Sequence, residues 1–197
     1  MAQTVINLAC PGCGAPATTA STMCDFCSRP IVISTFTSVA EMPLGDINKY
    51  ANSYRKALAE NPDSQVLNNS LAMCYLKLKL YDKALPAFEK AIEETFDNSE
   101  TFFYAAVSLL KGKKAFLALR ETIDKIEEYI NAALMIEPRG IYYFYQAYIK
   151  YDYFARKSFR TTPTYQDALQ NANAAGVSPN DIENLFSILG VPRPETI

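Results

Sequence analysis

Histidine is absent from this chain of 197 residues, and the formal net charge is only −2. Without histidine the most common general base of enzymes is missing, and no glycine-rich phosphate-binding loop is present, so we expect no enzymatic activity. A general nucleic-acid binder needs an excess of clustered lysine and arginine, which this composition lacks. No run of 18 apolar residues occurs, and the N-terminus lacks the features of a signal peptide, so we expect neither a membrane-spanning helix nor secretion.

Cysteine is also scarce, but four of the five cysteines lie close together in the sequence. They form two pairs, CPGCG and CDFCS, with the spacing C-x2-C-x10-C-x2-C: Cys10, Cys13, Cys24 and Cys27. Two residues between paired cysteines let one tight turn direct two sulfur atoms at a single ion, and two such turns give tetrahedral coordination that suits Zn²⁺. Tight pairs with only Cys74 left over indicate a metal site in a reducing compartment, so we expect a cytoplasmic protein.

β-branched residues flank the cysteine pairs, in VINL before the first pair and IVISTF after the second, and both stretches predict short strands. Residues 5–36 resemble the zinc-ribbon family through CPGCG and CDFCS. One structural Zn²⁺ is expected, because four cysteines fill the coordination shell. A rubredoxin-like iron centre is the alternative. Residues 1–40 carry Arg29 as their only basic side chain, so protein contact is a more plausible use of the ribbon than nucleic-acid binding.

The hydrophobic pattern changes to a helical one after residues 41–46, a short segment with proline and glycine. Two stretches of the helical part are related at an interval of 34 residues, which aligns Tyr54 with Phe88, Ala57 with Ala91 and Leu58 with Ile92. This interval is the length of a tetratricopeptide repeat (TPR). The stretch SLAMCYLKLKLYDKALPAFEKAI resembles the consensus of that family, with small residues at Ala72, Ala84 and Ala91 where paired helices approach closely.

The resemblance spans residues 47–159, although only the repeat at 63–96 is a close match. A later copy of the repeat contains about eight additional residues around KGKKAFLALRET, which we expect to lengthen a helical hairpin. Two further helices are predicted, because a capping box of Thr164 with Asp167 marks the start of the first, and Ser178 with Asp181 marks the start of the second. The last helix either caps the array or docks a partner through its apolar residues, Ile182, Leu185, Phe186 and Leu189.

The sequence therefore predicts a mainly α protein: a TPR-like α-solenoid of helical hairpins with a small N-terminal β zinc ribbon. The expected parts are the ribbon at 1–40, a linker at 41–46, helical repeats at 47–160, and capping helices with a tail at 161–197. Resemblance to TPR proteins implies that the first helix of each hairpin lines a surface that holds a peptide or a helix. The residues expected on that surface are Asn69, Met73, Leu76, Phe103, Val107, Leu110, Tyr142, Tyr145 and Ile149.

The main functional hypothesis is a non-enzymatic adaptor or scaffold for protein–protein interaction, without membrane contact and with homo-oligomer formation left open. A different class is nucleic-acid association through the ribbon and a basic group at Lys111, Lys113, Lys114 and Arg120, joined by Arg156, Lys157 and Arg160. A third hypothesis is a structural subunit whose inner face is filled by its own C-terminal helix or by another copy.

Overall fold

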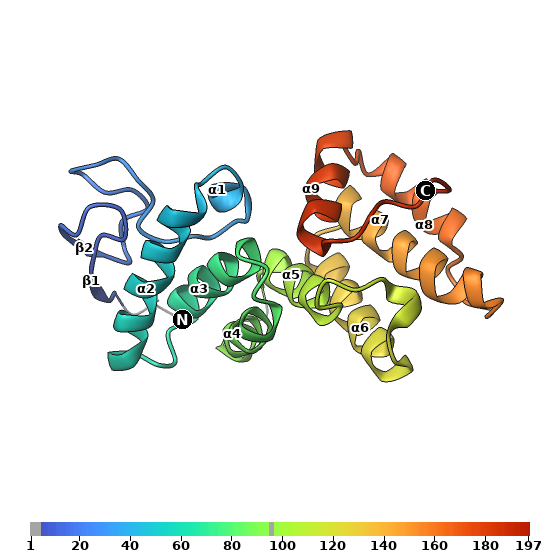
Figure 1. Cartoon of the computed structure of the whole chain (residues 1–197), viewed down its shortest axis with the longest axis horizontal. Coiled ribbons are helices and arrows are strands. Elements are labelled where there is room, and N and C mark those ends of the chain that lie inside the picture. Colours follow the sequence, from blue (N-terminus) through green and yellow to red (C-terminus); the bar gives the residue numbers. More distant parts are fainter. Residues whose placement is uncertain (1–4, 95–96) are drawn as a thin grey trace. The chain divides into compact units, whose positions relative to one another are not determined.

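The computed structural model describes residues 5–94 and 97–197 of the chain. These residues fall into two compact units, on either side of a boundary between Phe96 and Asp97 (Figure 1). The last two residues of the repeat predicted at 63–96 lie outside the described part. Most of the described chain is helical, which confirms a mainly α protein of helical hairpins with a small N-terminal sheet.

The first unit begins with the ribbon and continues as helices. Its elements are β1 (Asn7–Ala9), β2 (Pro16–Thr18), α1 (Thr37–Ala40), α2 (Leu44–Glu60), α3 (Gln65–Lys77) and α4 (Tyr81–Glu94). The strands β1 and β2 are antiparallel, with Leu8 opposite Ala17. Helices α3 and α4 form a hairpin in which Ala72, Ala84 and Ala91 are all fully buried. The small residues therefore lie where the TPR resemblance implies, at the close approach of two helices.

The second unit contains two more helical hairpins and a final helix. Its α-helices are α5 (Ser99–Leu109), α6 (Arg120–Ile136), α7 (Gly140–Ile149), α8 (Tyr165–Ala174) and α9 (Pro179–Leu189). A 3₁₀ turn at Ala115–Leu117 precedes α6, and α7 continues into a π-helical turn at Lys150–Phe154 and a 3₁₀ turn at Ala155–Lys157. Helix α5 pairs with α6, α7 pairs with α8, and α9 lies against α5 and α7 (Figure 1).

Both predicted helix starts near the C-terminus are confirmed. At α8 the Thr164 hydroxyl accepts a hydrogen bond from the Asp167 backbone N–H, and the Asp167 carboxylate accepts one from the Thr164 backbone N–H. Ser178 and Asp181 repeat this capping box at α9. Gly190 ends α9 at a positive φ of 68°, a conformation that glycine adopts without steric strain.

The expectation of a strand at IVISTF is wrong. The segment 31–36, here called the connecting segment, forms no strand. Its Ile31 backbone N–H donates to the Thr22 carbonyl of the ribbon, and side chains of α2 and α3 bond its other polar groups at Ile31 and Ile33. The Ile33 backbone N–H donates to Ser70 Oγ at 2.9 Å, and Tyr54 Oη donates to the Ile31 carbonyl at 2.9 Å. Ile31 and Ile33 are buried, at 2% and 1% exposure. Their β-branched character therefore reflects burial against helices, whereas the second strand, β2, lies between the cysteine pairs.

The predicted linker at 41–46 is partly helical, since α2 begins at Leu44. Asp46 lies in the first turn of α2 and pairs with Arg29 of the ribbon at 3.2 Å. Tyr50 and Tyr54 on α2 are fully buried, and Tyr50 Oη donates to the Pro30 carbonyl at 3.0 Å. By the 34-residue alignment α2 corresponds to the second helix of a repeat. Before it, the described residues contain only the ribbon and the four-residue helix α1, and the ribbon packs on α2. The division of the chain into a ribbon at 1–40, a linker at 41–46, repeats at 47–160 and capping helices with a tail at 161–197 stays a prediction.

The additional residues around KGKKAFLALRET were expected to lengthen a helical hairpin. Instead, residues 111–119 form a loop that contains the 3₁₀ turn, and the last three residues of this stretch begin α6. Lys111 and Gly112 both have a positive φ, at 49° and 74°, which ends α5. The loop is anchored at Ala115, which is fully buried. The Phe116 backbone N–H donates to Asp152 Oδ2 at 2.8 Å.

The contact between the connecting segment and α3 gives a testable prediction about stability. Ser70 is fully buried, and its Oγ accepts from Ile33 N–H and donates to the Val66 carbonyl. Changing Ser70→Ala leaves the Ile33 N–H unpaired in the core, so we expect a loss of about 1–3 kcal/mol in the free energy of unfolding. Denaturant unfolding, monitored by hydrogen exchange of the backbone amides in the first unit, measures this loss in stability.

Ser53→Ala is the matched control for this experiment. Ser53 Oγ donates to the Ala9 carbonyl at 3.1 Å, but at an exposed position where water replaces the lost group. We expect a change within about 0.5 kcal/mol. Equal losses for the two variants would contradict the assigned role of Ser70.

Candidate metal centre and interaction surfaces

The four paired cysteines converge at one end of the ribbon. All four sulfur atoms lie within 4.8 Å of one another. The Sγ atoms of Cys10 and Cys27 are 3.7 Å apart, as are those of Cys13 and Cys24. A tetrahedral ion with zinc–sulfur bonds of about 2.3 Å places its sulfur ligands about 3.8 Å from each other. The cluster therefore fits one metal ion with four sulfur ligands.

Two equivalent turns position these sulfur atoms. In the first turn the Cys10 carbonyl accepts from Gly14 N–H at 2.8 Å, and Cys10 N–H donates to the Ala15 carbonyl at 2.7 Å. In the second, the Cys24 carbonyl accepts from Ser28 N–H at 2.8 Å, and Cys24 N–H donates to the Arg29 carbonyl at 2.8 Å. Gly14 and Ser28 occupy the same place, and both have a positive φ, at 81° and 54°. CPGCG and CDFCS thus fold into one shape despite their different sequences.

The electrostatics of the cluster differ between its sulfur atoms. Backbone hydrogen bonding from Phe26 lowers the pKa of Cys24 to about 7, which favours a thiolate. At Cys27 a backbone hydrogen bond from Arg29 also favours the thiolate, but burial and the neighbouring sulfur atoms outweigh it and raise the pKa to about 12. Four sulfur atoms this close repel one another when all are ionised, and a bound cation removes that repulsion.

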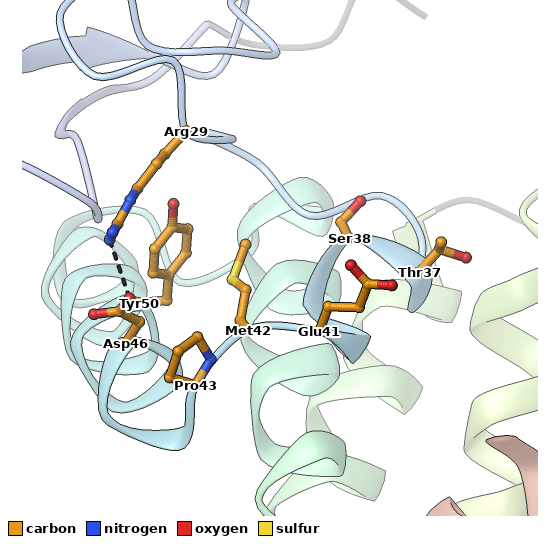
Figure 2. A pocket seen from close by; sticks show the side chains of 8 residues that line it. All are labelled: Arg29, Thr37, Ser38, Glu41, Met42, Pro43, Asp46 and Tyr50. Carbon is orange, nitrogen blue, oxygen red and sulfur yellow. Dashed lines mark ion pairs between the residues drawn. The ribbon is translucent and has the colours of Figure 1, made fainter.

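A pocket of about 350 Å³ lies beside the contact between the ribbon and α2, away from the four sulfur atoms. Figure 2 shows Arg29 reaching across it to Asp46, with Glu41 and Met42 on the side of α1. A hydrogen bond from Lys49 and the charge of Arg29 lower the pKa of Asp46. Burial raises the pKa of Tyr50 well above its ordinary value, so the hydroxyl stays protonated and donates to Pro30. This pocket is lined by groups that hold the ribbon on α2.

The nine residues predicted to bind a partner are all buried in the structure. None is more than 4% exposed: Asn69, Met73, Leu76, Phe103, Val107, Leu110, Tyr142, Tyr145 and Ile149. In α3 the connecting segment covers part of this face, since Asn69 Nδ2 donates to the Ile33 carbonyl at 3.2 Å. Lys77 Nζ in turn donates to the Ala40 carbonyl in α1. The expected open surface is therefore absent at these nine positions, and their role in binding stays a prediction.

In the second unit the predicted residues pack between α5 and α7. The rings of Phe103 and Tyr142 lie 4.6 Å apart, and Tyr145 Oη donates to the Ala106 carbonyl at 3.1 Å. The aromatic residues that face α9 were missed: Phe186 of α9 packs against Phe144 at 6.3 Å and Tyr148 at 5.3 Å. The spacing of Phe144 and Tyr148, four residues apart on one helix face, is the signal that could have identified them.

The basic group is partly neutralised. Arg120 pairs with Asp124 at 2.8 Å, and Arg156 pairs with the buried Asp152. Lys157 lies 3.8 Å from the centre of the Tyr153 ring.

Among the described residues, no helix is long and apolar enough to cross a bilayer.

Comparison with known proteins agrees with this geometry. The tetratricopeptide repeat family model matches residues 45–102. Among solved structures, "MamA MSR-1 C2" has a TM-score of 0.51 and 19% sequence identity, and the match covers 71% of this chain and 72% of that chain. "MamA AMB-1 P212121" also has a TM-score of 0.51, with 20% identity over 80% of this chain and 75% of that chain.

At these identities the similarity to solved structures concerns the fold alone. Comparison with curated proteins gives no significant match. A fold of this type is typical of scaffolds for protein–protein interaction. The chain thus contains a tetratricopeptide repeat within a TPR-like helical fold, preceded by four cysteines arranged to hold one metal ion.

Proposed function

We propose that this protein is a non-enzymatic adaptor of the cytoplasm, which holds a helical or peptide segment of a protein partner against its TPR-like hairpins. The repeat at 45–102 and the TPR-like fold support an interaction scaffold. Free cysteines that converge on a metal site support a reducing compartment.

The observation that carries this proposal is the position of α9. This helix lies against α5 and α7, which are the first helices of two successive hairpins. Its residues Ile182, Leu185, Phe186 and Leu189 are all at most 7% exposed. Apolar residues at this spacing form one face of a helix, and such a face laid into a groove is a common mode of partner recognition. The chain's own helix therefore indicates the kind of ligand that this face accepts.

In the proposed complex, an amphipathic helix of the partner takes the place of α9. Phe144 and Tyr148 then contact the partner, with Phe103, Val107, Leu110, Tyr142, Tyr145 and Ile149 packed beneath them. In the first unit the connecting segment covers the corresponding helix α3, where Asn69, Met73 and Leu76 lie. The partner can also be a second copy of this chain. In that case each copy places its α9 on α5 and α7 of the other copy, which yields a homo-oligomer.

The proposed metal is one structural Zn²⁺ bound by Cys10, Cys13, Cys24 and Cys27. Four thiolates at tetrahedral spacing suit Zn²⁺ and leave no open position for a reacting molecule. The bound ion holds the two turns of the ribbon together. The ribbon in turn covers Tyr50 and Tyr54 of α2, so the ion supports the first helices of the array.

Displacement of α9 is the experiment that tests the proposed surface. In Phe186→Asp a charge replaces the ring that contacts Phe144 and Tyr148, so α9 should detach and uncover the face. We expect the purified variant to bind a synthetic peptide of residues 177–197 at least on the order of tenfold more tightly than the unchanged chain does, because the internal helix no longer competes. Fluorescence anisotropy of the labelled peptide measures the affinity.

Ser187→Asp is the matched control, because Ser187 is the next residue of α9 and is exposed. It adds the same charge without removing the ring contacts, so peptide affinity should stay that of the unchanged chain. Circular dichroism reports whether the helices of both variants persist. A folded Phe186→Asp variant that gains no affinity for the peptide would show that this face is not a binding surface.

Nucleic-acid association, the alternative, has less support from the described residues. Two cations of the basic group, Arg120 and Arg156, are paired with carboxylates. Retention on DNA or RNA that falls with salt, and that is lost in Lys113→Glu/Lys114→Glu, would favour it over the adaptor.

A further inference from the structure

Two loops of the second unit combine exposed apolar side chains with a cluster of cations. We propose that this surface, here called the basic prong, binds the surface of an anionic lipid bilayer. The basic prong consists of the apolar residues Leu117, Leu119 and Phe159 and the cations Lys113, Lys114, Arg120, Arg156, Lys157 and Arg160.

Contacts between the loops show that they form one surface. The Phe116 ring lies 4.6 Å from the Arg156 guanidinium and 5.1 Å from Lys157 Nζ. Arg120 lies 5.2 Å from the Phe154 ring, and Phe159 N–H donates to the Phe154 carbonyl at 2.9 Å. The loop before α6 and the segment after α7 are therefore neighbours, although about forty residues separate them in the sequence.

The apolar members of the basic prong project into solvent. Leu117 is 69% exposed, Leu119 is 73% exposed and Phe159 is 51% exposed. The base of their loop is held in place, because Ala115 is fully buried and Phe116 N–H donates to the buried Asp152. Apolar side chains on an anchored, protruding loop can enter the boundary between lipid headgroups and acyl chains without ordering the loop first.

The charge of this region favours an anionic surface. Six cations belong to the basic prong, and two of them are paired, Arg120 with Asp124 and Arg156 with Asp152. The other four are Lys113, Lys114, Lys157 and Arg160, and the further acidic groups next to the prong among the described residues are Glu121 and Glu195. The whole chain has a net charge of −2, so positive charge is concentrated here while the remainder is acidic. Clusters of four to eight lysines and arginines beside apolar groups are typical of proteins that bind anionic lipids of the cytoplasmic leaflet.

A pocket of about 370 Å³ adjoins the basic prong. Lys114, Arg156 and Arg193 line it, together with Asp152 and Glu195. Asp152 already pairs with Arg156, and Arg193 Nε already donates to the Ile197 carbonyl at 2.6 Å. Lys114 is therefore the cation of this pocket that receives the phosphate of a lipid headgroup, with Glu195 as the opposing charge.

A lipid surface fits these observations better than the other polyanions do. Nucleic acid binds cations through its phosphates but provides few apolar contacts for the exposed Leu117 and Leu119. A protein partner would need a pocket shaped for these two leucines, whereas the acyl chains of a bilayer adapt to their shape. The earlier expectation of no membrane contact came from the lack of a spanning segment. Binding at the bilayer surface requires no such segment.

Co-sedimentation with lipid vesicles tests the proposal on the full-length protein. We expect binding to vesicles that contain phosphatidylglycerol and little binding to vesicles of phosphatidylcholine alone, because the attraction depends on anionic headgroups. Leu117→Ser/Leu119→Ser and Lys113→Glu/Lys114→Glu should each weaken binding on the order of tenfold. All these positions are exposed, so the variants should keep their helical circular dichroism.

Matched controls come from elsewhere on the chain. Met135→Ser removes a side chain that is 88% exposed, and Arg55→Glu/Lys56→Glu reverses two adjacent exposed cations of α2. Both controls should bind like the unchanged protein. The proposal is overturned if the unchanged protein ignores phosphatidylglycerol, or if the controls lose as much binding as the prong variants.

The same variants separate lipid from the other polyanions. Binding to single-stranded DNA or to polyglutamate that depends on Lys113 and Lys114 but not on the two leucines, with no vesicle binding, would reassign the basic prong to a nucleic acid or an acidic protein. The vesicle assay uses the purified protein alone, so its outcome does not depend on the proposed adaptor function.

Discussion

Cys24→Ser is expected to remove the bound metal and unfold the ribbon. Cys24 is 3% exposed, and its sulfur lies 3.7 Å from that of Cys13, so serine leaves an incomplete ligand set in a small core. The ribbon buries few side chains of its own, and metal binding of about 10–16 kcal/mol in comparable zinc modules is folding free energy. Elemental analysis should find one zinc per chain in the unchanged protein and far less in the variant.

Loss of the ribbon should also affect the helices next to it. Tyr50 Oη and Tyr54 Oη donate to carbonyls of Pro30 and Ile31, and these contacts depend on the ribbon being folded. We therefore expect faster hydrogen exchange in α2 and the N-terminal half of α3, while the second unit keeps its protection. Treatment of the unchanged protein with a strong chelator should produce the same pattern.

Cys74→Ala is the matched control for the metal site. Cys74 is fully buried within α3, and burial raises the pKa of its thiol to about 12, so it stays a neutral apolar group. This variant should retain one metal ion per chain despite some loss of stability. Purified protein without any metal, or metal that survives Cys24→Ser unchanged, would show that the four cysteines are not the site.

Tyr145→Ala is expected to destabilise the second unit by about 3–5 kcal/mol, as for other large aromatic residues removed from a core. Tyr145 is fully buried, and its ring lies 5.7 Å from that of Phe103 and 6.3 Å from that of Tyr148. Burial holds its pKa well above the ordinary value, so the hydroxyl remains protonated and donates to the Ala106 carbonyl. Denaturant unfolding with hydrogen exchange assigned to each unit measures the loss.

Two further variants separate packing from hydrogen bonding at this position. Tyr145→Phe keeps the ring but leaves the Ala106 carbonyl without this donor, so we expect a smaller loss of about 1–3 kcal/mol. Tyr143→Ala lies on the same helix at a half-buried position and should cost less than Tyr145→Ala. If Tyr143→Ala destabilised the unit as strongly as Tyr145→Ala, the core of this hairpin pair would have been assigned wrongly.

The predictions that succeeded depend on short-range chemistry. The spacing of two cysteine pairs predicts that four sulfur atoms converge, because a tight turn alone directs both sulfur atoms of a pair. A capping box such as Thr164 with Asp167 lies within four residues, so its hydrogen bonds form wherever the helix begins. The small residues at Ala72, Ala84 and Ala91 recur at the period of one structural unit, and this period identifies the hairpin.

The expected strand at IVISTF failed, and the role of the nine residues chosen for partner binding stays a prediction, because both required knowledge of what covers each face. IVISTF has the composition of a strand, yet Ile31 and Ile33 are buried by helices α2 and α3. The Ile33 N–H and the Ile31 carbonyl are bonded to the side chains of Ser70 and Tyr54, which lie far along the chain. The nine partner-binding residues were selected by register, which places a residue on one face of a helix. It does not say whether that face meets solvent or another element, such as α9.

The sequence by itself determined the cluster of four sulfur atoms, the mainly helical repeat fold and the starts of the last two helices, because each follows from residues close together or from one repeating period. The tertiary structure alone decided that the ribbon packs on α2, that α9 lies on α5 and α7, and that two distant loops form the basic prong. These arrangements depend on which apolar faces find each other when the chain collapses, and burial of that kind has no fixed spacing in the sequence.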